Sequence, residues 1–488
     1  MVGDGMNTEN GSKGLSVKKN ENFSQWYTEI VQKAELADLR YKVKGFLVFQ
    51  PWSVLAMEKM YDHLEKVLQK KGHNPYFFPT VIPESNLKKE SEHVEGFSPE
   101  VFWITEAGGK KLEERLALRP TSETAFYQMF NKWIRSYKDL PFKTYQRANV
   151  FRYETKATRP FLRSREFYWI ETHCAFATQE EAELQIKEDM KTTQEVLHDI
   201  FGLPFLFFER PAWDRFPGAE RTFAADVLNP DGRVIQQPST HLLSRAFSKG
   251  FHVLFTDKDG KEKYAFLTCY GPAISRIFAS VVSVHGDDKG LRFPWTIAPL
   301  HVIIVPVQND RTVMKKIEEL KKRIEMFASV DIDVSDKSPG EKFNYWEMKG
   351  VPVRIDFGRN ELKKRELTVF RRDLNKKEIV KENKIIKYLH KVARESGLHL
   401  TEQADALFKG KIKQVKILHE IEKVIRDGGI ARCSFCSLGK EGTRCAERIE
   451  KEIGARVRGK KLEKEKPFSA CVVCGKKAQN VVYIAKDY

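Results

Sequence analysis

Residues 149–176 read NVFRYETKATRPFLRSREFYWIETHCAF, an apolar stretch that carries four arginines near a tryptophan and a histidine. Two apolar segments, 150–154 and 166–173, have the aromatic and β-branched composition of strands. The loop between them, TKATRPFLRS, carries two of the four arginines of the stretch. The pattern predicts an antiparallel hairpin.

The predicted hairpin gathers arginine and acidic side chains. Since side chains alternate along a strand, Arg152 and Glu154 point to the same face of the first segment. Trp169, Glu171 and His173 likewise share one face of the second segment. Guanidinium groups suit phosphate, and an aromatic wall with acceptors suits a small ligand that carries an amine. The alternative is an exposed hairpin with Arg–Glu pairs, which stabilise little.

Two further stretches favour a ligand site. RPTSETAFYQMF (119–130) places Thr121 and Glu123 at a strand-to-helix turn, although Thr121 could simply cap the helix. TCYGPAISRIFASVV (268–282) has a Gly-Pro turn and then Arg276 in the first turn of an apolar helix. An arginine there opposes the helix dipole, so a negatively charged ligand would explain it.

The length of 488 residues predicts about three domains. Apolar stretches over 23–296 favour an antiparallel sheet with flanking helices, one of which follows Pro51. Strands and helices then alternate over about 100 residues from 298, as in an α/β module, and a charged helical connector follows. No GxxxxGK[ST] or GxGxxG phosphate-binding loop occurs in the sequence.

The composition predicts a soluble, cytoplasmic protein. Hydrophobic residues make up 41% and charged residues 31%, and no apolar run approaches the roughly 20 residues that span a bilayer. Residues 1–22 are polar, lack the apolar core of a signal peptide and read as a flexible tail. We therefore expect no membrane association.

The net charge of +17 favours an anionic partner, with nucleic acid first. Residues 406–488 hold 20 Lys and Arg against 10 Asp and Glu, and so carry +10 of this charge. The alternative is a basic surface that is merely solvated.

Five of the seven cysteines cluster near the end of the chain, at 433, 436, 445, 471 and 474. Clustered cysteines in a cytosolic chain indicate a metal before disulfides. Two CxxC pairs are typical of zinc sites, but five cysteines compete for four positions, and reduced thiols without metal are the alternative.

Several of these motifs, taken in order, resemble those of class II aminoacyl-tRNA synthetases. Pro51 with the long helix after it resembles motif 1, FRYE (151–154) resembles motif 2, and GPAISR (271–276) resembles motif 3. Stretches similar to the prolyl-tRNA synthetase family within this class are RPTSE (119–123), REFYWIETHCAF (165–176) and VHGDDKGLRFP (284–294). The resemblance extends from about residue 23 to Tyr488, whose carboxylate it places against the catalytic domain.

The resemblance implies an α+β multidomain protein. Its parts would be a catalytic domain over 23–296, with the antiparallel sheet and flanking helices of class II synthetases, an α/β anticodon-binding domain over 297–402, and a small C-terminal zinc-binding-like α/β domain over 403–488. It also implies a homodimer formed through motif 1. Only 123 residues separate Arg152 from Arg276, which leaves no room for the editing insertion of the bacterial-type branch and favours the archaeal and eukaryotic branch.

The implied function is that of a proline–tRNA ligase. Such an enzyme activates L-proline with ATP and Mg²⁺ to prolyl-adenylate, releases pyrophosphate, and transfers proline to the 3′ end of tRNA(Pro). A class II synthetase of another specificity and a synthetase-like protein without catalysis are the alternatives. The pocket residues argue against the first, and the presence of Arg152, Glu154 and Arg276 argues against the second.

The resemblance also implies residue roles. ATP would be bound by Arg152, Glu154, Arg163, Gln236, Ser239 and Arg276, with Arg152 and Arg276 catalytic. Proline would be bound by Thr121, Glu123, Arg152, Trp169, Glu171, His173 and His241. Contacts to the anticodon would come from Glu361, Lys364 and Arg371. Ser239 departs from the threonine usual in the family.

For the metal site, the family's second ligand precedes an acidic helix that resembles AERIEKEIG (446–454). The resemblance therefore favours a structural zinc held by Cys436, Cys445, Cys471 and Cys474, with Cys433 as the alternative ligand.

Overall fold

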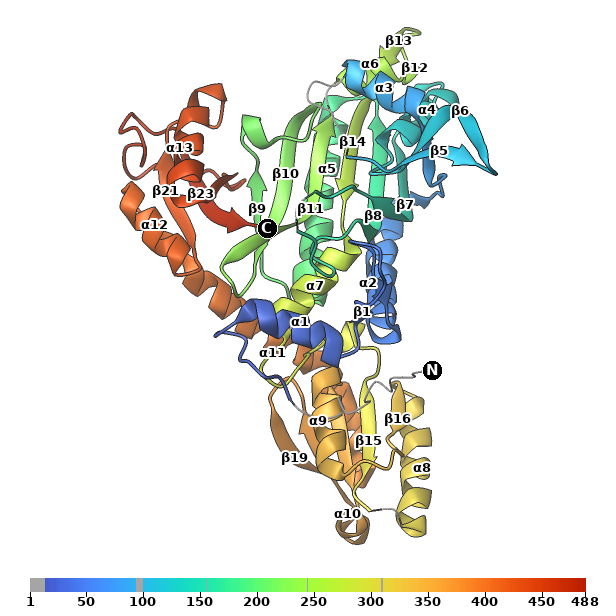
Figure 1. Cartoon of the computed structure of the whole chain (residues 1–488). Coiled ribbons are helices and arrows are strands. Elements are labelled where there is room, and N and C mark those ends of the chain that lie inside the picture. Colours follow the sequence, from blue (N-terminus) through green and yellow to red (C-terminus); the bar gives the residue numbers. More distant parts are fainter. Residues whose placement is uncertain (1–13, 94–99, 156, 244, 309) are drawn as a thin grey trace, which may run out of the picture.

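The structure is a computed structural model that describes residues 14–93, 100–155, 157–243, 245–308 and 310–488. It has three parts: a central domain, an α/β domain below it in the view of Figure 1, and a C-terminal domain at the left of the central one. Within the described ranges, no helix is long and apolar enough to cross a membrane. The predicted multidomain α+β fold is confirmed.

An antiparallel sheet forms the centre of the central domain. Its strands, in spatial order, are β3 (Asn74–Pro75), β7 (Phe142–Phe151), β8 (Glu166–Phe176), β14 (Phe266–Gly271), β11 (Arg233–Leu243), β10 (Ala219–Leu228) and β9 (Leu206–Glu209). Only the short pairing of β3 with β7 is parallel among these strands. Three small sheets accompany it: β1 (Ala37–Asp38) with β2 (Val48–Phe49), β4 (Val81–Pro83) with β6 (Lys110–Leu118) and β5 (Trp103–Ala107), and β12 (Leu254–Thr256) with β13 (Glu262–Tyr264).

Helices cover one face of the central sheet, whereas the other face is covered only in part, by a helix whose Phe126 stacks on His173, and is otherwise free for the site. The helices of this domain are α1 (Phe23–Lys33), α2 (Pro51–Lys70), α3 (Glu84–His93), α4 (Glu123–Trp133), α5 (Gln179–Thr193), α6 (Arg245–Gly250) and α7 (Ile274–His285). Ile170 of β8 packs in the core shared with α1, α2 and α7, whereas Cys174 packs against α5. The alternate side chains of β8 therefore point to the opposite face.

The predicted hairpin forms. Its two strands are longer than predicted, and the first strand ends earlier than predicted. β7 and β8 pair from Phe142 opposite Ala175 to Phe151 opposite Glu166. The prediction that the first strand continues to residue 154 was wrong, because the chain leaves the sheet after Phe151. Arg152 still donates its backbone N–H to Arg165, and the chain then turns away.

The α/β domain has a five-stranded sheet in the order β16 (Val330–Ile332), β15 (Val302–Pro306), β17 (Val353–Phe357), β18 (Glu366–Arg371) and β19 (Lys376–Lys381). Its helices are α8 (Arg311–Glu325), α9 (Pro339–Lys349) and α10 (Arg359–Lys364). The apolar face of α8 and those of the strands form a separate core. The long α11 (Ile385–Lys411) leads from this domain to the C-terminal one (Figure 1).

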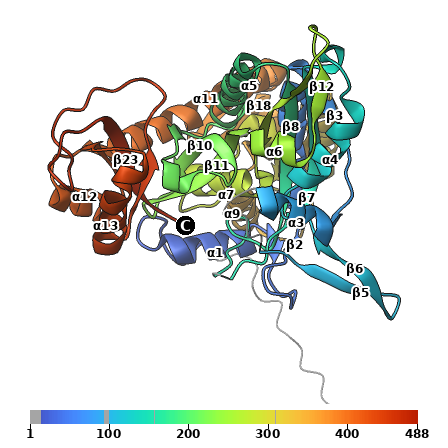
Figure 2. The same cartoon turned by 90° about the horizontal axis from the view of Figure 1, so that it is seen from above.

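The C-terminal domain extends the central sheet. It contains β20 (Ile412–Gln414), α12 (Leu418–Arg426), β21 (Ile430–Phe435), α13 (Thr443–Ile453), β22 (Arg456–Gly459) and β23 (Asn480–Asp487). β23 pairs with β11 in parallel at Arg233 and Lys486, so the two sheets are continuous. The view from above shows this domain beside β10 and β11 (Figure 2).

Of the predicted N-terminal tail, residues 1–13 lie outside the described residues. The described part, 14–22, makes specific contacts. Ser16 donates its backbone N–H to Glu29, 2.8 Å away. Lys19 donates its ammonium to the carbonyl of Gly286 at 2.6 Å, so this part is attached to the central domain.

Candidate active site

A cavity of about 470 Å³ opens on the free face of the central sheet. Its lining includes the predicted residues Thr121, Glu123, Arg152, Glu154, Trp169, Glu171, His173, Gln236, Ser239, His241 and Arg276. They come from the start of α4, the end of β7, β8, β11 and the first turn of α7. Arg163 lies in an adjoining small cavity together with Arg152, Glu154 and Arg276. The structure thus brings together all the residues predicted to bind small ligands.

At one end of the cavity, two carboxylates lie beside the same hydroxyl group. The hydroxyl of Thr121 lies 2.5 Å from Glu123 Oε2 and 3.2 Å from Glu171 Oε2. Glu171 also accepts from the backbone N–H of Ser122 at 3.1 Å and from Gln146 Nε2 at 2.6 Å. Ser122 precedes α4 but makes no side-chain cap, so the polar groups of this turn serve the cavity instead.

The two carboxylates have opposite protonation tendencies. Burial would raise the pKa of Glu171, but hydrogen bonds from His173 and its other donors outweigh burial and lower the pKa to about 2. Burial raises the pKa of Glu123, and the nearby charge of Glu171 adds to the rise. His173 lies 3.1 Å from Glu171 and 3.1 Å from the hydroxyl of Tyr127, which fixes its ring. A cationic amine is the group that this end would stabilise.

The other end of the cavity is cationic. Burial, helped by the positive charges of Arg152 and Arg163, lowers the pKa of Arg276 to about 10. Glu154 is the nearby counter-charge, and its carboxylate is 4.0 Å from Arg163. Arg276 donates to the backbone carbonyl of Gln236 at 3.1 Å. Three neighbouring guanidinium groups make this end of the cavity positive, and a polyphosphate would neutralise it.

Arg163 also reaches the last residue of the chain. Its Nη2 lies 2.5 Å from a main-chain carboxylate oxygen of Tyr488, whose hydroxyl donates to Asp231 at 2.7 Å. The expected return of Tyr488 to the catalytic domain is confirmed.

Strand β11 contributes a neutral polar wall. Burial and the charge of Arg210 lower the pKa of His241 to about 3, so its imidazole is uncharged at neutral pH. The ring lies 3.0 Å from the hydroxyl of Ser239 and 3.0 Å from that of Thr222. Phe216 packs on the same ring, with 4.7 Å between centroids.

Sequence reasoning missed part of the lining. Asp214, Arg215, Phe216 and Pro217 form a loop over the cavity, with no strand or helix periodicity to reveal it. Gly271 could have been found from the Gly-Pro turn: a Cβ there would lie 2.3 Å from the Trp169 ring, so only glycine allows the indole to close the pocket wall.

The predicted anticodon residues are not alike. Lys364 is exposed at the end of α10. Glu361 accepts from the backbone N–H of Gly358 at 3.0 Å and thereby caps α10. Arg371 is only 2% exposed and makes a two-pronged ion pair with Asp373. Its guanidinium is therefore not available at the surface in this structure.

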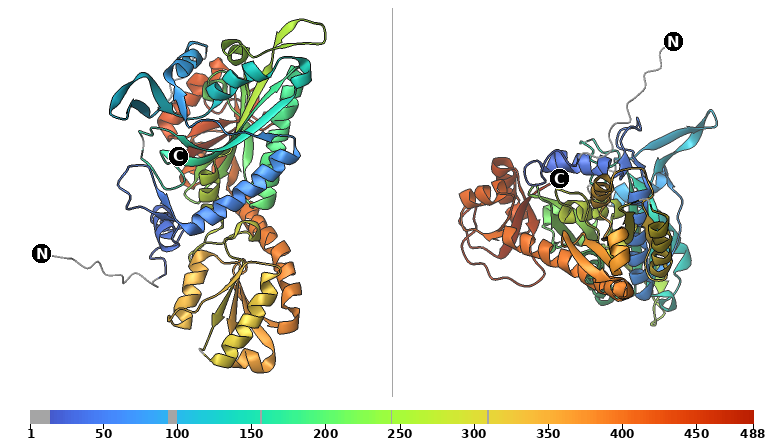
Figure 3. Two further views of the ribbon diagram at one scale, coloured as in Figure 1. Left: turned by 90° about the vertical axis from the view of Figure 1, so that its right-hand side faces the viewer. Right: turned by 90° about the horizontal axis from the view of Figure 1, so that it is seen from below.

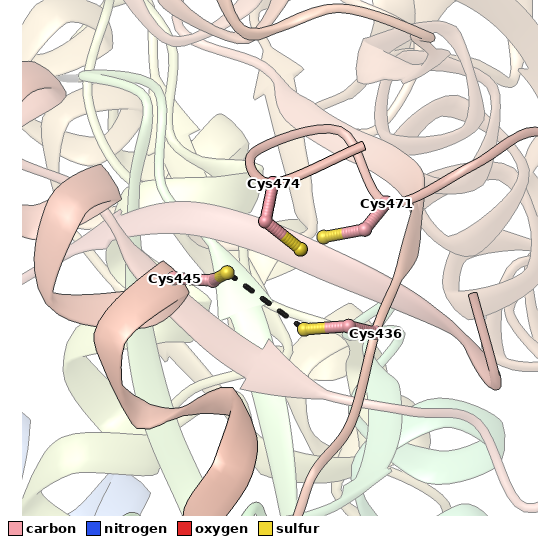
Figure 4. A group of neighbouring side chains, drawn as sticks. All are labelled: Cys436, Cys445, Cys471 and Cys474. Atoms are coloured by element: carbon pink, nitrogen blue, oxygen red, sulfur yellow. Dashed lines mark hydrogen bonds between the residues drawn. The ribbon is translucent and has the colours of Figure 1, made fainter. Parts of the chain in front are cut away.

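Four of the five clustered cysteines lie close together. Cys436, Cys445, Cys471 and Cys474 place their sulfur atoms within 4.8 Å of one another (Figure 4). The Cys436 and Cys445 sulfurs are 3.7 Å apart, close to the roughly 3.8 Å edge of a tetrahedron with Zn–S bonds of about 2.3 Å. Cys433 is buried in the same domain but is not part of this sulfur group, so the four-cysteine set is the one that fits zinc.

Comparison with known proteins gives a consistent result. Family models match residues 102–285 (tRNA synthetase class II core domain for G, H, P, S and T), 301–392 (anticodon binding domain) and 418–488 (prolyl-tRNA synthetase, C-terminal). All three fall within the predicted domains.

Full-length relatives are similar throughout. The chain is 48% identical to a proline–tRNA ligase of Thermofilum pendens, over 98% of this chain and 99% of the relative, and 41% identical to one of Methanopyrus kandleri, over 96% of each. It superposes with a TM-score of 0.93 on Giardia lamblia prolyl-tRNA synthetase in complex with prolyl-adenylate, at 36% identity over 98% of this chain and 100% of that one. The Cryptosporidium parvum prolyl-tRNA synthetase, complexed with halofuginone and AMPPNP, gives 0.90 at 29% identity, over 97% and 99%.

Proposed function

This chain belongs to the prolyl-tRNA synthetase family, and on that premise we propose how it acts. It activates L-proline with ATP, releases pyrophosphate, and transfers proline from the adenylate to the 3′ end of tRNA(Pro). Its relatives carry the name proline–tRNA ligase, and one similar structure holds prolyl-adenylate. As an enzyme of translation, it would work in the cytoplasm.

One observation carries the proposal: a single cavity has an acidic end and a cationic end. Proline is a compact zwitterion with an ammonium in its ring and a carboxylate beside it. Glu123 and Glu171 would hold the ring nitrogen with the hydroxyl of Thr121, and Trp169 would enclose the ring. Arg152 would bind the carboxylate from the cationic side.

The same geometry suits adenylate formation. The proline carboxylate must attack the α-phosphate in line, although both groups are anionic. Arg152 and Arg276 neutralise this charge and fix the two reactants, so charge cancellation and positioning supply the catalysis. No general base is required, because the carboxylate is already ionised. Mg²⁺ would enter with ATP and supply further charge neutralisation.

The remaining ATP contacts line the cationic end. Glu154 would accept from the adenine amino group or its neighbours, and Arg163 would lie over the phosphates on the motif 2 loop. Gln236 and Ser239 would contact the nucleotide from β11, whereas His241 would face proline. Ser239 and His241 lie next to each other in this wall, because the Ser239 hydroxyl is hydrogen-bonded to the His241 ring.

For tRNA(Pro), the proposed anticodon contacts come from the α/β domain that the anticodon-binding model matches. Lys364 and Glu361 remain the proposed readers. Arg371 would have to leave its pair with Asp373 to take part, so we assign it to the domain's internal structure.

The metal proposal is one structural Zn²⁺ bound by Cys436, Cys445, Cys471 and Cys474. The four sulfurs provide the closed set of four ligands that structural zinc prefers, and bound metal would join the end of β21, the start of α13 and the loop before β23.

The homodimer proposal rests on the edge of the central sheet. The strand order ends at β3, and Phe77 just beyond it is 81% exposed. A cavity of about 620 Å³ lies there, lined by Phe77, by Tyr61 of α2 and by Arg147. An unpaired edge next to an exposed aromatic ring is a surface that a second copy would cover.

Charging of tRNA tests the proposed function. Purified protein, ATP and labelled proline should acylate a tRNA(Pro) transcript, and the Arg276→Ala variant should not. A transcript with an alanine anticodon and acceptor stem is the control RNA. Equal charging of both transcripts, or none of either, would overturn the proposal.

A further inference from the structure

Two arginines surround one aspartate where the C-terminal domain joins the catalytic sheet. Asp226 of β10 is 0% exposed, and Arg210 and Arg458 are buried beside it. Arg210 follows β9, whereas Arg458 belongs to β22 of the C-terminal domain. Because β22 pairs with β23 and β23 pairs with β11, the sheet itself brings Arg458 to this place. None of these three residues lines the cavity.

The three side chains satisfy one another almost completely. Arg458 donates Nε to Asp226 Oδ2 at 2.8 Å and Nη2 to Oδ1 at 3.2 Å. Arg210 donates Nη2 to Asp226 Oδ1 at 2.7 Å and Nη1 to Oδ2 at 3.1 Å. Arg210 Nη1 also donates to the backbone carbonyl of Arg458 at 2.7 Å. Such two-pronged pairs fix orientation as well as charge.

The charges explain how the three buried groups are held together. Burial would raise the pKa of Asp226, but the charges of Arg210 and Arg458 outweigh burial and keep the carboxylate ionised. Burial lowers the pKa of Arg210, and the charge of Arg458 adds to this effect. Asp226 is the carboxylate that both buried guanidinium groups share, and Arg458 also pairs with Asp487 at 3.0 Å.

From this cluster one hydrogen bond reaches the active site. Arg210 Nη2 lies 3.3 Å from the side-chain oxygen of Gln236, which lines the cavity. Asp226 is directly opposite Gln236 in the pairing of β10 with β11. Arg276 holds the backbone carbonyl of the same glutamine, so Arg210 is the donor that orients its carboxamide.

We propose that Arg458 is a positioning residue for the nucleotide subsite: through Asp226 and Arg210 it fixes the side chain of Gln236. This inference rests on the proposed role of Gln236 in ATP binding. It gives the C-terminal domain a part in amino acid activation without any contact to substrate. Removing Arg458 leaves Asp226 with Arg210 alone, so Arg210 turns further toward the carboxylate and its hold on Gln236 loosens.

The test is the Arg458→Met variant in proline-dependent ATP–pyrophosphate exchange. We expect KM for ATP to rise roughly fivefold, the size of one lost hydrogen bond, with KM for proline changed less than about twofold. Arg458→Lys, which keeps the charge beside Asp226, should recover part of the loss. Arg456→Met is the matched control. Arg456 lies on the same strand and also reaches Asp487, but it makes no bond to Asp226, so its KM for ATP should equal that of the wild type.

A double-mutant cycle separates positioning from a general structural effect. In a Gln236→Ala background, Arg458→Met should add less than about 1.5-fold to KM for ATP. Additive effects in the cycle, an equal rise in both KM values, or an unchanged KM for ATP would overturn the inference. If Arg458→Met does not fold, the cycle is run with Arg458→Lys and judged by the same criteria. Absence of proline-dependent exchange in the wild type would instead overturn the proposed function, so the two failures are distinguishable.

Discussion

Three guanidinium groups, those of Arg152, Arg163 and Arg276, lie together at one end of the cavity, and Arg163 also contacts Glu154 and the main-chain oxygen of Tyr488. Burial is the main cause of the lowered pKa of Arg276, and repulsion from Arg152 and Arg163 adds to it. A polyphosphate relieves this repulsion, so the energy stored among the arginines favours ATP. The arginines were visible in the sequence because they interrupt apolar segments where salt bridges alone would gain little.

The first prediction concerns these arginines. Arg152→Ala and Arg276→Ala should each lower proline-dependent pyrophosphate exchange on the order of 10²-fold, because each removes a charge that stabilises the transition state. Thermal melting should stay near that of the wild type. Arg359→Ala is the control, since Arg359 is exposed and pairs with Asp310 far from the cavity. Near-normal exchange in either test variant would remove that arginine from its role.

The second prediction concerns Glu123. Its raised pKa means that it takes up a proton as pH falls, whereas Glu171, with a pKa of about 2, stays ionised. A neutral Glu123 no longer attracts the ring ammonium, so kcat/KM for proline should begin to fall at a pH above that at which an ordinary glutamate takes up its proton. Glu123→Gln should be low at high pH and should change little as pH falls. A wild-type profile without any decline would contradict the assignment.

At the scale of elements, sequence reasoning placed the strands and helices well but not their ends. The alternation around Trp169 and the 3.6-residue period after Pro51 identified β8 and α2, because burial on one face imposes these periods. The end of β7 was misplaced because aromatic residues continue beyond Phe151, while the end of pairing is set by contacts with distant residues such as Glu100. The loop at 214–217 was missed because it has no strand or helix periodicity, and only the folded chain brings it to the cavity.

The third prediction concerns the cysteine loops. Spacing alone left five cysteines for four positions, whereas in the fold Cys433 is not part of the sulfur group. Cys436→Ala and Cys445→Ala should reduce zinc from about one per chain and lower the melting temperature, because metal binding contributes directly to folding. Cys433→Ala should retain full zinc. Metal analysis decides the matter, and loss of zinc in Cys433→Ala with retention in Cys445→Ala would reverse the ligand set.

At the scale of the whole molecule, the last strand of the chain, β23, joins the central sheet of the first domain. In Figure 3, the α/β domain lies at the opposite end of the molecule from the central sheet, and α2 runs along one side of that sheet. The order of domains followed from the change of pattern near residue 298. The continuity of β23 with β11 did not, because strand pairing between distant segments leaves no periodic signal in either segment.

The fourth prediction concerns assembly. The wild type should sediment as a dimer of its 56.6 kDa chain, and Phe77→Glu should shift it toward the monomer because a buried charge replaces an aromatic contact. Met326→Glu is the matched control, since Met326 is 82% exposed in the α/β domain and should leave the dimer intact. A wild type that is monomeric at micromolar concentration would contradict the proposal.

The central claim is that the cavity selects proline. Its most direct test is ATP–pyrophosphate exchange measured with each of the twenty amino acids. Proline should give the highest kcat/KM. Alanine, which a pocket built around a larger ring cannot exclude by steric clash, should follow with a loss of roughly 10–200-fold. Faster exchange with threonine, histidine or glycine than with proline would contradict the account, because the residues around Glu123 and Trp169 would then recognise a different side chain.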